Sequence, residues 1–238
     1  MMGVIGISFP SCTGILGGLY DKPVKKDIGF VQVSGHTGVI ALDVNQYDQW
    51  NYIDFSGQAI YQKDIEYPVG QPVDGKDYEV PEHWDIANHR HDVKTNGGAI
   101  MKTPYESFND FLNLKEVPEG EFVSDIPAAD PSADLQSEDV KGKISVDMSG
   151  MMDGNIGYIA SSINLEIEDW LVMYGGMPPS FKYSPNVYLV KLADGTYLGL
   201  KLQDYLNKMI DIVVDGEKKR ASRKILSFEY FYPIEFKE

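Results

Sequence analysis

An Asp-Gly pair close to the C-terminus constrains the fold of this chain more than any other feature of its sequence. Asp194-Gly195 lies between residues 186–192 and 196–202, two runs rich in Val, Leu and Tyr. Asp-Gly between two apolar runs is typical of a tight β-hairpin, because both residues adopt the backbone angles that the turn requires. We therefore expect two antiparallel strands here.

A second Asp-Gly pair extends this pattern toward the end of the chain. Asp215-Gly216 follows the apolar residues 209–214 and precedes the aromatic run 225–232. The basic segment 218–220 falls in the predicted connection. The sequence therefore predicts a second hairpin and a chain that ends in sheet.

The rest of the chain also favours strands. Residues 37–44 and 50–55 are rich in β-branched and aromatic side chains. Residues 117–142 are rich in Pro, Asp, Ser and Ala and predict a long exposed loop. We expect a single all-β, antiparallel β-rich domain over residues 29–238, with long loops and little helix, after a signal and tether in residues 1–28.

Helix signals are weak. Residues 103–111 could form one or two turns, with Thr103 as the N-cap and Pro104 at the first helical position. Residues 202–209 could contain a further helical turn.

The charge balance excludes one class of partner. The 238 residues contain 21 Lys and Arg against 36 Asp and Glu, a net charge of −15. Such a chain repels the phosphate backbone, so no nucleic acid partner is expected. No apolar run approaches the roughly 20 residues that a membrane helix needs. One cysteine among 238 residues excludes a disulfide framework and a cysteine-based metal cluster.

The lone cysteine, Cys12, follows the short apolar run of residues 1–9. This arrangement resembles the end of a bacterial lipoprotein signal, in which the cysteine becomes lipidated. Residues 14–26 contain Gly, Pro and mixed charges and resemble a tether. Lipidation of Cys12 would attach the protein to a membrane by its lipid anchor only. The alternative is that Cys12 is a small residue in a flexible N-terminal segment.

Three histidines lie close together. On an extended strand, His83, His89 and His91 would share one face, and His89 with His91 could chelate zinc or copper. Asp85 or Asp92 could complete such a site. This would be the signature of a metal enzyme.

A structural role for the same segment is the other interpretation. Asp85, His89, Arg90 and Asp92 could form a hydrogen-bonded network that holds the sheet together, with Arg90 paired to a carboxylate. No Ser, Cys or carboxylate arrangement of a known catalytic type accompanies the histidines, and we expect no enzyme.

The His-rich segment resembles the central motif of the HmuY family. The matching residues are Trp84-Asp85-Ile86-Ala87, His89-Arg90, Asp92-Val93 and Asn96 with its following glycines. Residues 42–56 resemble the opening strands of the family, and residues 183–233 resemble its closing hairpin. The resemblance covers roughly residues 35–236 in order.

The resemblance implies a function. HmuY proteins are all-β haem-binding lipoproteins, or haemophores, on the outer surface of Gram-negative bacteria, and they pass haem to a TonB-dependent outer-membrane receptor. The resemblance therefore implies haem as ligand, such a receptor as partner, and an outer-membrane, cell-surface location with a lipid anchor at Cys12. The alternative is a surface lipoprotein of the same fold that binds a protein or glycan and no haem.

The chain departs from the family pattern in two places. Asn88 replaces a usually apolar residue, and His91 replaces a usual Tyr. In the founding member two histidines in the later half of the chain hold the iron. Because no histidine follows His91 here, that pair cannot be carried over.

Some relatives hold haem with two methionines, whose thioether sulfur is a soft, neutral donor suited to ferrous iron. Alternation predicts that Met148 and Met173 lie on strand faces in the core. Gly and Pro place Met151, Met152 and Met177 on loops. We predict Met151 and Met177 as the axial ligands, with Met152 as the alternate partner; the other interpretation is that these side chains fill gaps beneath loops.

Other residues are predicted for the same pocket. Tyr158 and Tyr174 could stack on the ligand. Lys182 could pair with the anionic haem propionates, on the basis of its proximity in sequence to Met177.

Overall fold

The structure is a computed structural model that describes residues 28–74, 78–176 and 179–236. These residues contain fifteen β-strands and very little helix, and the predicted all-β, antiparallel fold is confirmed. Cys12 and Met177 lie outside the described residues.

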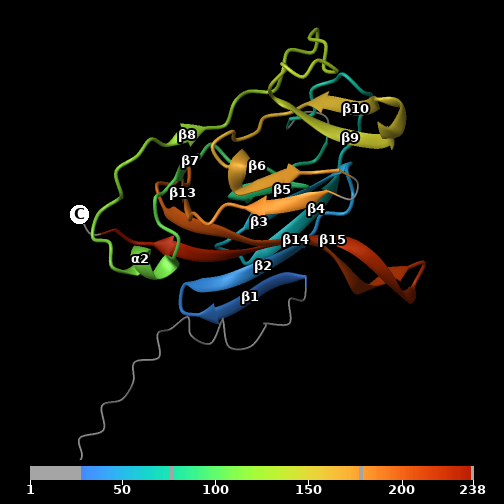
Figure 1. Cartoon of the computed structure of the whole chain (residues 1–238). Helices are drawn as coiled ribbons and strands as arrows, with labels where there is room; N and C mark the ends of the chain where they lie inside the picture. Colours follow the sequence, from blue (N-terminus) through green and yellow to red (C-terminus); the bar gives the residue numbers. More distant parts are fainter. Residues whose placement is uncertain (1–27, 75–77, 177–178, 237–238) are drawn as a thin grey trace, which may run out of the picture.

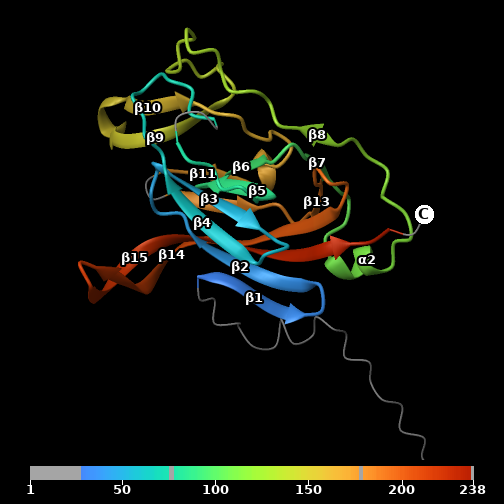
Figure 2. The same cartoon turned by 180° about the vertical axis from the view of Figure 1, so that it is seen from behind.

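Two main sheets face each other (Figures 1 and 2). The larger has the strand order β1 (Gly29–Ser34), β2 (Thr37–Asp43), β15 (Glu217–Ile234), β14 (Tyr197–Val214), β13 (Tyr188–Lys191), β7 (Ala99–Lys102) and β8 (Val123–Ser124). The smaller has the order β4 (Ala59–Asp64), β3 (Gln49–Asp54), β5 (Ile86–His89) and β6 (Asp92–Thr95).

Two short hairpins complete the architecture. The first joins β9 (Lys143–Gly150) to β10 (Asn155–Ala160) through the 3-10 turn η1 (Met151–Asp153). The second pairs β11 (Leu171–Tyr174) with β12 (Ser180–Tyr183) and follows the 3-10 turn η2 (Glu168–Trp170).

The main core lies between the two large sheets. Ile40 and Phe228 of the larger sheet pack in one cluster with Ile53, Ile86 and Val93 of the smaller sheet. The opposite face of the smaller sheet is also covered, because Trp50 and other residues of that face pack against the β9–β10 hairpin. Strand β3 is therefore buried on both faces, although its sequence alternates polar and apolar residues.

A third cluster covers the outer face of the larger sheet. Met101, Val187 and Leu189 pack there against Phe108 and Phe111 of the short helix α2 (Phe108–Leu112). The three clusters together place β9–β10 on one side of the molecule and α2 on the other (Figure 1).

Both predicted hairpins are confirmed. Strand β13 pairs with β14 across the turn that contains Asp194-Gly195, and β14 pairs with β15 across Asp215-Gly216. The φ angles of Asp215 and Gly216 are 54° and 79°, as a two-residue hairpin turn requires. The basic segment 218–220 belongs to β15 rather than to the connection, so the prediction of its place was wrong.

The helix predictions were largely wrong. Residues 202–209 are strand, because their pairing with β15 outweighs local propensity. Helix α2 starts at Phe108, with Ser107 as N-cap accepting from the Asn109 backbone N–H at 3.1 Å. Thr103 does not cap it, since its hydroxyl donates to the Val187 carbonyl at 2.7 Å and is buried.

The predicted long loop at 117–142 is confirmed, apart from the two-residue strand β8. In the described part of the chain no helix is both long enough and apolar enough to span a membrane.

Candidate functional site

The His-rich segment forms a tight turn instead of one extended strand. Strand β5 ends at His89, Arg90 has a left-handed φ of 54°, and β6 begins at Asp92. His83 precedes β5, and its side chain is exposed. The predicted common face for the three imidazoles is therefore wrong, because the chain reverses direction between His89 and His91.

His89 is fully buried and both of its ring nitrogens are engaged. Nδ1 lies 3.0 Å from Oδ2 of Asp92, and Nε2 donates to the Tyr47 carbonyl at 2.6 Å. Burial tends to raise the pKa of Asp92, but the hydrogen bond with His89 and the charges of His91 and Arg90 hold it below its usual value. This geometry supports the structural interpretation and leaves no nitrogen of His89 to bind a metal.

Arg90 links the turn to the loop after β2. Its guanidinium donates to the carbonyls of Val44 and Asn45 and to the Tyr47 hydroxyl, and it lies 4.1 Å from the Tyr47 ring centroid. The predicted hydrogen-bonded pair with a carboxylate is not among its contacts in the described residues. Asp85 makes a separate contact, accepting from the Phe55 backbone N–H at 2.7 Å.

Beside this turn lies a cavity of about 300 Å³, at the lower end of the range for small-molecule sites. Four segments of the fold contribute to it, namely the His-rich turn with the loop before β3, the β9–β10 hairpin, the β11–β12 hairpin and the long β14–β15 hairpin. Its lining residues are Tyr47, Arg90, His91, Ser145, Met148, Met151, Leu171, Met173, Pro179, Phe181, Tyr205 and Lys224.

Three methionines line this cavity. Met148 comes from β9, Met151 from η1 and Met173 from β11. Met151 is 43% exposed, and the turn that carries it is closed by Gly154, whose φ is 77°. The structure therefore brings one predicted ligand, Met151, into a cavity with two methionines that the sequence assigned to the core.

The prediction that Met148 and Met173 are core residues was wrong. Met173 does share a face with Leu171, as predicted, but this face leaves the core at Met173 and borders the cavity, where Met173 is 63% exposed. Met148 is only partly buried, although Ile144 and Val146 of the same strand face are core residues. Alternation gives the face of a residue, whereas the tertiary structure decides what the face meets.

The other predicted pocket residues lie elsewhere. Met152 is 86% exposed and is not among the lining residues. Neither Tyr158 nor Tyr174 lines the cavity, and Tyr158 instead contacts the Lys143 ammonium 4.4 Å from its ring centroid. Met177 precedes the lining residue Pro179 by two positions.

Lys182 also lies outside the cavity. Strands β11 and β12 pair Met173 with Phe181 and Val172 with Lys182. Directly opposed residues share a face, so Met173 and Phe181 line the cavity while Lys182 lines a separate, smaller cavity beside Asp169.

The cations of the site are Arg90 and Lys224 instead. Lys224 is one of five Lys and Arg within residues 218–224, and nothing in the sequence distinguishes it from the others. Only the register of β14 with β15 places it near Tyr205.

Tyr205 supplies a neutral phenol to the site. Burial raises its pKa to about 12, against the opposing charge of Arg90. Its hydroxyl is therefore protonated at neutral pH in the absence of a ligand.

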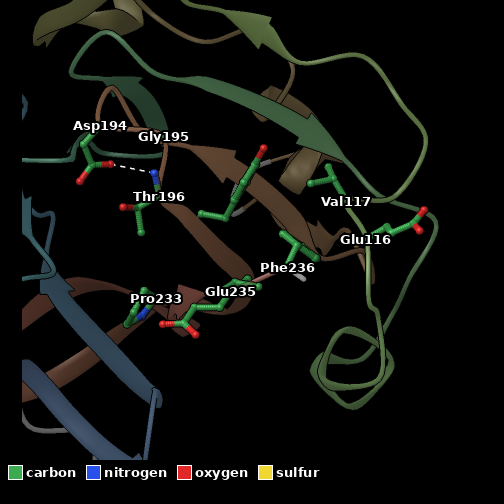
Figure 3. Close-up of a pocket in the computed structure, with 10 residues that line it drawn as sticks. Glu116, Val117, Asp194, Gly195, Thr196, Pro233, Glu235 and Phe236 are labelled. Carbon is green, nitrogen blue, oxygen red and sulfur yellow. Dashed lines mark hydrogen bonds between the residues drawn. The ribbon is translucent and has the colours of Figure 1, made fainter. Parts of the chain in front are cut away.

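The larger cavity shown in Figure 3 has a different character. It measures about 900 Å³ and lies between the β13–β14 turn and the C-terminal end of β15. Glu116, Asp194 and Glu235 line it, and the Asp194 carboxylate accepts from the Thr196 backbone N–H at 2.8 Å. None of its lining residues is Met, Lys or Arg. This cavity therefore offers no thioether sulfur to bind iron and no cation to bind an anionic ligand.

Comparisons with known proteins agree with this architecture. Residues 46–230 match the family described as HmuY protein. A crystal structure of a candidate HmuY-like heme binding protein from Bacteroides vulgatus is 36% identical, with a TM-score of 0.66, and covers 88% of this chain and 100% of its own. No curated protein matches.

Two further structures share the fold. A candidate lipoprotein from Bacteroides fragilis is 31% identical over 90% of this chain and 100% of its own, with a TM-score of 0.66. The apo HmuY analog of Tannerella forsythia is 21% identical over 82% of this chain and 95% of its own, with a TM-score of 0.55, and supports the fold alone. The family match spans well over half of the sequence, and the chain belongs to the HmuY family, a family of binding proteins rather than enzymes.

Proposed function

We propose that this protein captures haem in the methionine-lined cavity and holds its iron through thioether sulfur. The observation that carries the proposal is the meeting of Met148, Met151 and Met173 around one cavity that also contains two cations. Haem requires an apolar surface for its ring, soft or nitrogen donors for its iron and cations for its carboxylates. The lining residues provide all three.

Met151 is the first proposed ligand. Met177 remains its proposed partner, and Met152 the alternate, although the high exposure of Met152 makes it a poorer candidate than the cavity methionines. Met148 and Met173 enter as further candidates because they line the same cavity. His91 adds one imidazole to the lining, so a mixed imidazole and thioether pair is a distinct outcome.

The proposal extends to the biological role of the protein. Family membership, together with the lipoprotein from Bacteroides fragilis, supports a haemophore that is anchored to the outer membrane at the cell surface through Cys12 and hands haem to a TonB-dependent receptor. Cys12 follows an apolar segment that resembles a lipoprotein signal.

An absorption titration tests the ligands. Ferric haem, then haem reduced with dithionite, is added to the purified protein, and a sharpened, shifted Soret band with low-spin visible bands is expected. The change should be strongest in the ferrous state, because thioether sulfur favours ferrous iron. The double variant Met151→Ala, Met177→Ala should lose it, and an unchanged spectrum of the native protein in both redox states would refute haem binding.

Four further variants make the test specific. Met209→Ala is the matched control, because Met209 is 55% exposed on the distal part of β14 and does not line the cavity. Met148→Ala and Met173→Ala identify a ligand pair that differs from the proposed one. His91→Ala should leave a bis-thioether spectrum unchanged, whereas a loss of the spectrum would assign His91 to the iron.

A further inference from the structure

Lys224 presents a cation to the cavity without an anionic partner. Its ammonium lies 5.0 Å from the Tyr205 ring centroid and 5.1 Å from the Phe181 ring centroid. Among the described residues, no carboxylate lies within ion-pair distance of it. Contact with two aromatic faces stabilises a cation only in part, so the cavity retains a positive charge.

The backbone around Lys224 is held firmly in place. Its N–H donates to Oδ1 of Asn45 at 3.2 Å, and its carbonyl accepts from the Val44 N–H at 2.9 Å. On the other side, Asn207 is its register partner in β14. These bonds fix the position from which the side chain reaches the cavity.

A second cation reinforces the first. Arg90 lines the same cavity, and its guanidinium is already bound to Val44, Asn45 and Tyr47. It therefore adds positive charge at a fixed position, while Lys224 retains its hydrogen-bond donors. Burial and the charge of Arg90 both lower the pKa of Lys224, as expected for two cations that lie near each other.

The wall contributed by the two short hairpins is apolar apart from Ser145. Met148, Leu171, Met173 and Phe181 form it, with Pro179 beside them. A ligand that suits both parts of the cavity has a flat apolar body and carboxylates along one edge only.

We propose that Lys224, supported by the fixed charge of Arg90, forms a carboxylate-binding subsite, so that the cavity selects porphyrins by their acid edge whether or not they contain a metal. This inference rests on the proposed function and assigns the polar end of the same site. Metal-free protoporphyrin should therefore bind, and its binding should depend on Lys224 and not on a bond between methionine sulfur and iron.

Fluorescence titration with metal-free protoporphyrin IX tests the subsite. Lys224→Met should weaken binding of the diacid at least tenfold, and Lys224→Arg should restore most of it. The dimethyl ester of the same porphyrin should bind the native protein and Lys224→Met with equal, lower affinity. Lys182→Met is the matched control, since Lys182 lies on the opposite face of the β11–β12 hairpin, and it should bind the diacid as the native protein does.

The outcomes separate the two proposals. Equal affinity of the native protein and Lys224→Met for the diacid, with unchanged thermal unfolding of the variant, would overturn the subsite while the Soret band could still report methionine ligation. Diacid binding that depends on Lys224 in a protein without any Soret change would support the subsite and refute the iron ligands. Met151→Ala should retain binding of the metal-free diacid.

Discussion

Lys94 places a positive charge in the interior of this fold. Its side chain is 5% exposed, and its ammonium lies 2.9 Å from Oδ1 of Asp74 and 4.2 Å from the Trp50 ring centroid. Asp74 also accepts from the Ser161 hydroxyl at 3.1 Å and from the Ser162 N–H. This buried pair ties β6 to the segment after β10, behind the β9–β10 hairpin that carries Met148 and Met151.

Removing one member of this pair should cost more than removing both. Asp74→Asn leaves the Lys94 charge buried without its ion-pair partner, and we expect a loss of about 3–5 kcal/mol of unfolding free energy. The double variant Asp74→Asn, Lys94→Met should recover most of the loss, because Met fills a similar volume without charge. Urea unfolding of both variants and of Lys94→Met measures the cycle, and equal stability of the single and double Asp74 variants would contradict it.

The same cycle has a defined pH dependence. Burial tends to raise the pKa of Asp74, but the Lys94 charge and the hydrogen bonds from Ser162 lower it below its usual value. The stability from this carboxylate is complete above the unfolded-state pKa, near 4, and is lost as pH falls through the lower folded-state pKa. In acid the unfolding free energy of the native protein should therefore approach that of Asp74→Asn.

At the level of elements, the β14–β15 hairpin has two parts with different partners. Near the body, β14 pairs with β13 and β15 pairs with β2 over Ile225–Phe231. Beyond Lys224 the described strands pair only with each other, and the tip projects from the molecule (Figures 1 and 2). Met209 and Val213 on this distal part are 55% and 67% exposed. The cavity uses the proximal part, where Tyr205 and Lys224 lie.

Shortening the distal part in register should leave the fold and the site intact. Ile212 pairs with Lys219 and Val213 with Lys218, so deleting these four residues removes two pairs and keeps the Asp215-Gly216 turn. We expect unfolding free energy within about 0.5 kcal/mol of the native value and unchanged porphyrin binding, because the strand pairing of these residues in the described structure is confined to this hairpin. Differential scanning calorimetry and the titration above measure both.

Deleting Val213 alone is the matched control for this variant. A single deletion shifts the register or forces a bulge, which turns side chains to the wrong face. If the paired deletion destabilised the protein as much as the single one, the distal part would have a structural role that its pairing does not show.

The hairpins also show how far sequence patterns reach. Asp-Gly pairs between apolar runs identified both hairpins, since a tight turn is a local property of the chain. The strand at 202–209 was not predicted, because it depends on pairing with β15. Thr103 was wrongly predicted as the N-cap, because its hydroxyl donates to the carbonyl of Val187, which is distant in sequence. The face shared by Leu171 and Met173 was predicted, but its exposure was not.

At the level of the whole molecule, an acidic chain surrounds a cationic cavity. The net charge is −15, whereas the cavity contains Arg90 and Lys224 and, among its lining residues, no Asp or Glu. A dianionic porphyrin therefore meets repulsion at long range and attraction only near the site. The range of the repulsion is set by salt, with a Debye length of roughly 30 Å at 0.01 M and about 8 Å at 0.15 M.

The association rate of metal-free protoporphyrin IX should consequently rise several-fold between 0.01 M and 0.15 M salt. Salt weakens the long-range repulsion by the net charge of the molecule more than it weakens the short-range attraction to Lys224. Stopped-flow fluorescence measures the rate, with the neutral dimethyl ester as the control that should show no salt dependence. A rate that falls with salt would mean that the local cations govern the approach.

Sequence alone determined the fold class, the two hairpins, the family and Met151 as a cavity residue, because turns, alternation and motifs are local patterns that survive without coordinates. The tertiary structure alone decided that Met148 and Met173 border the cavity, that the Tyr47 carbonyl accepts from the second ring nitrogen of His89, and that Lys224 and not Lys182 lines the cavity. Each of these depends on which strand a residue meets across a sheet or hairpin. Such contacts join residues far apart in the chain, and no local pattern records them.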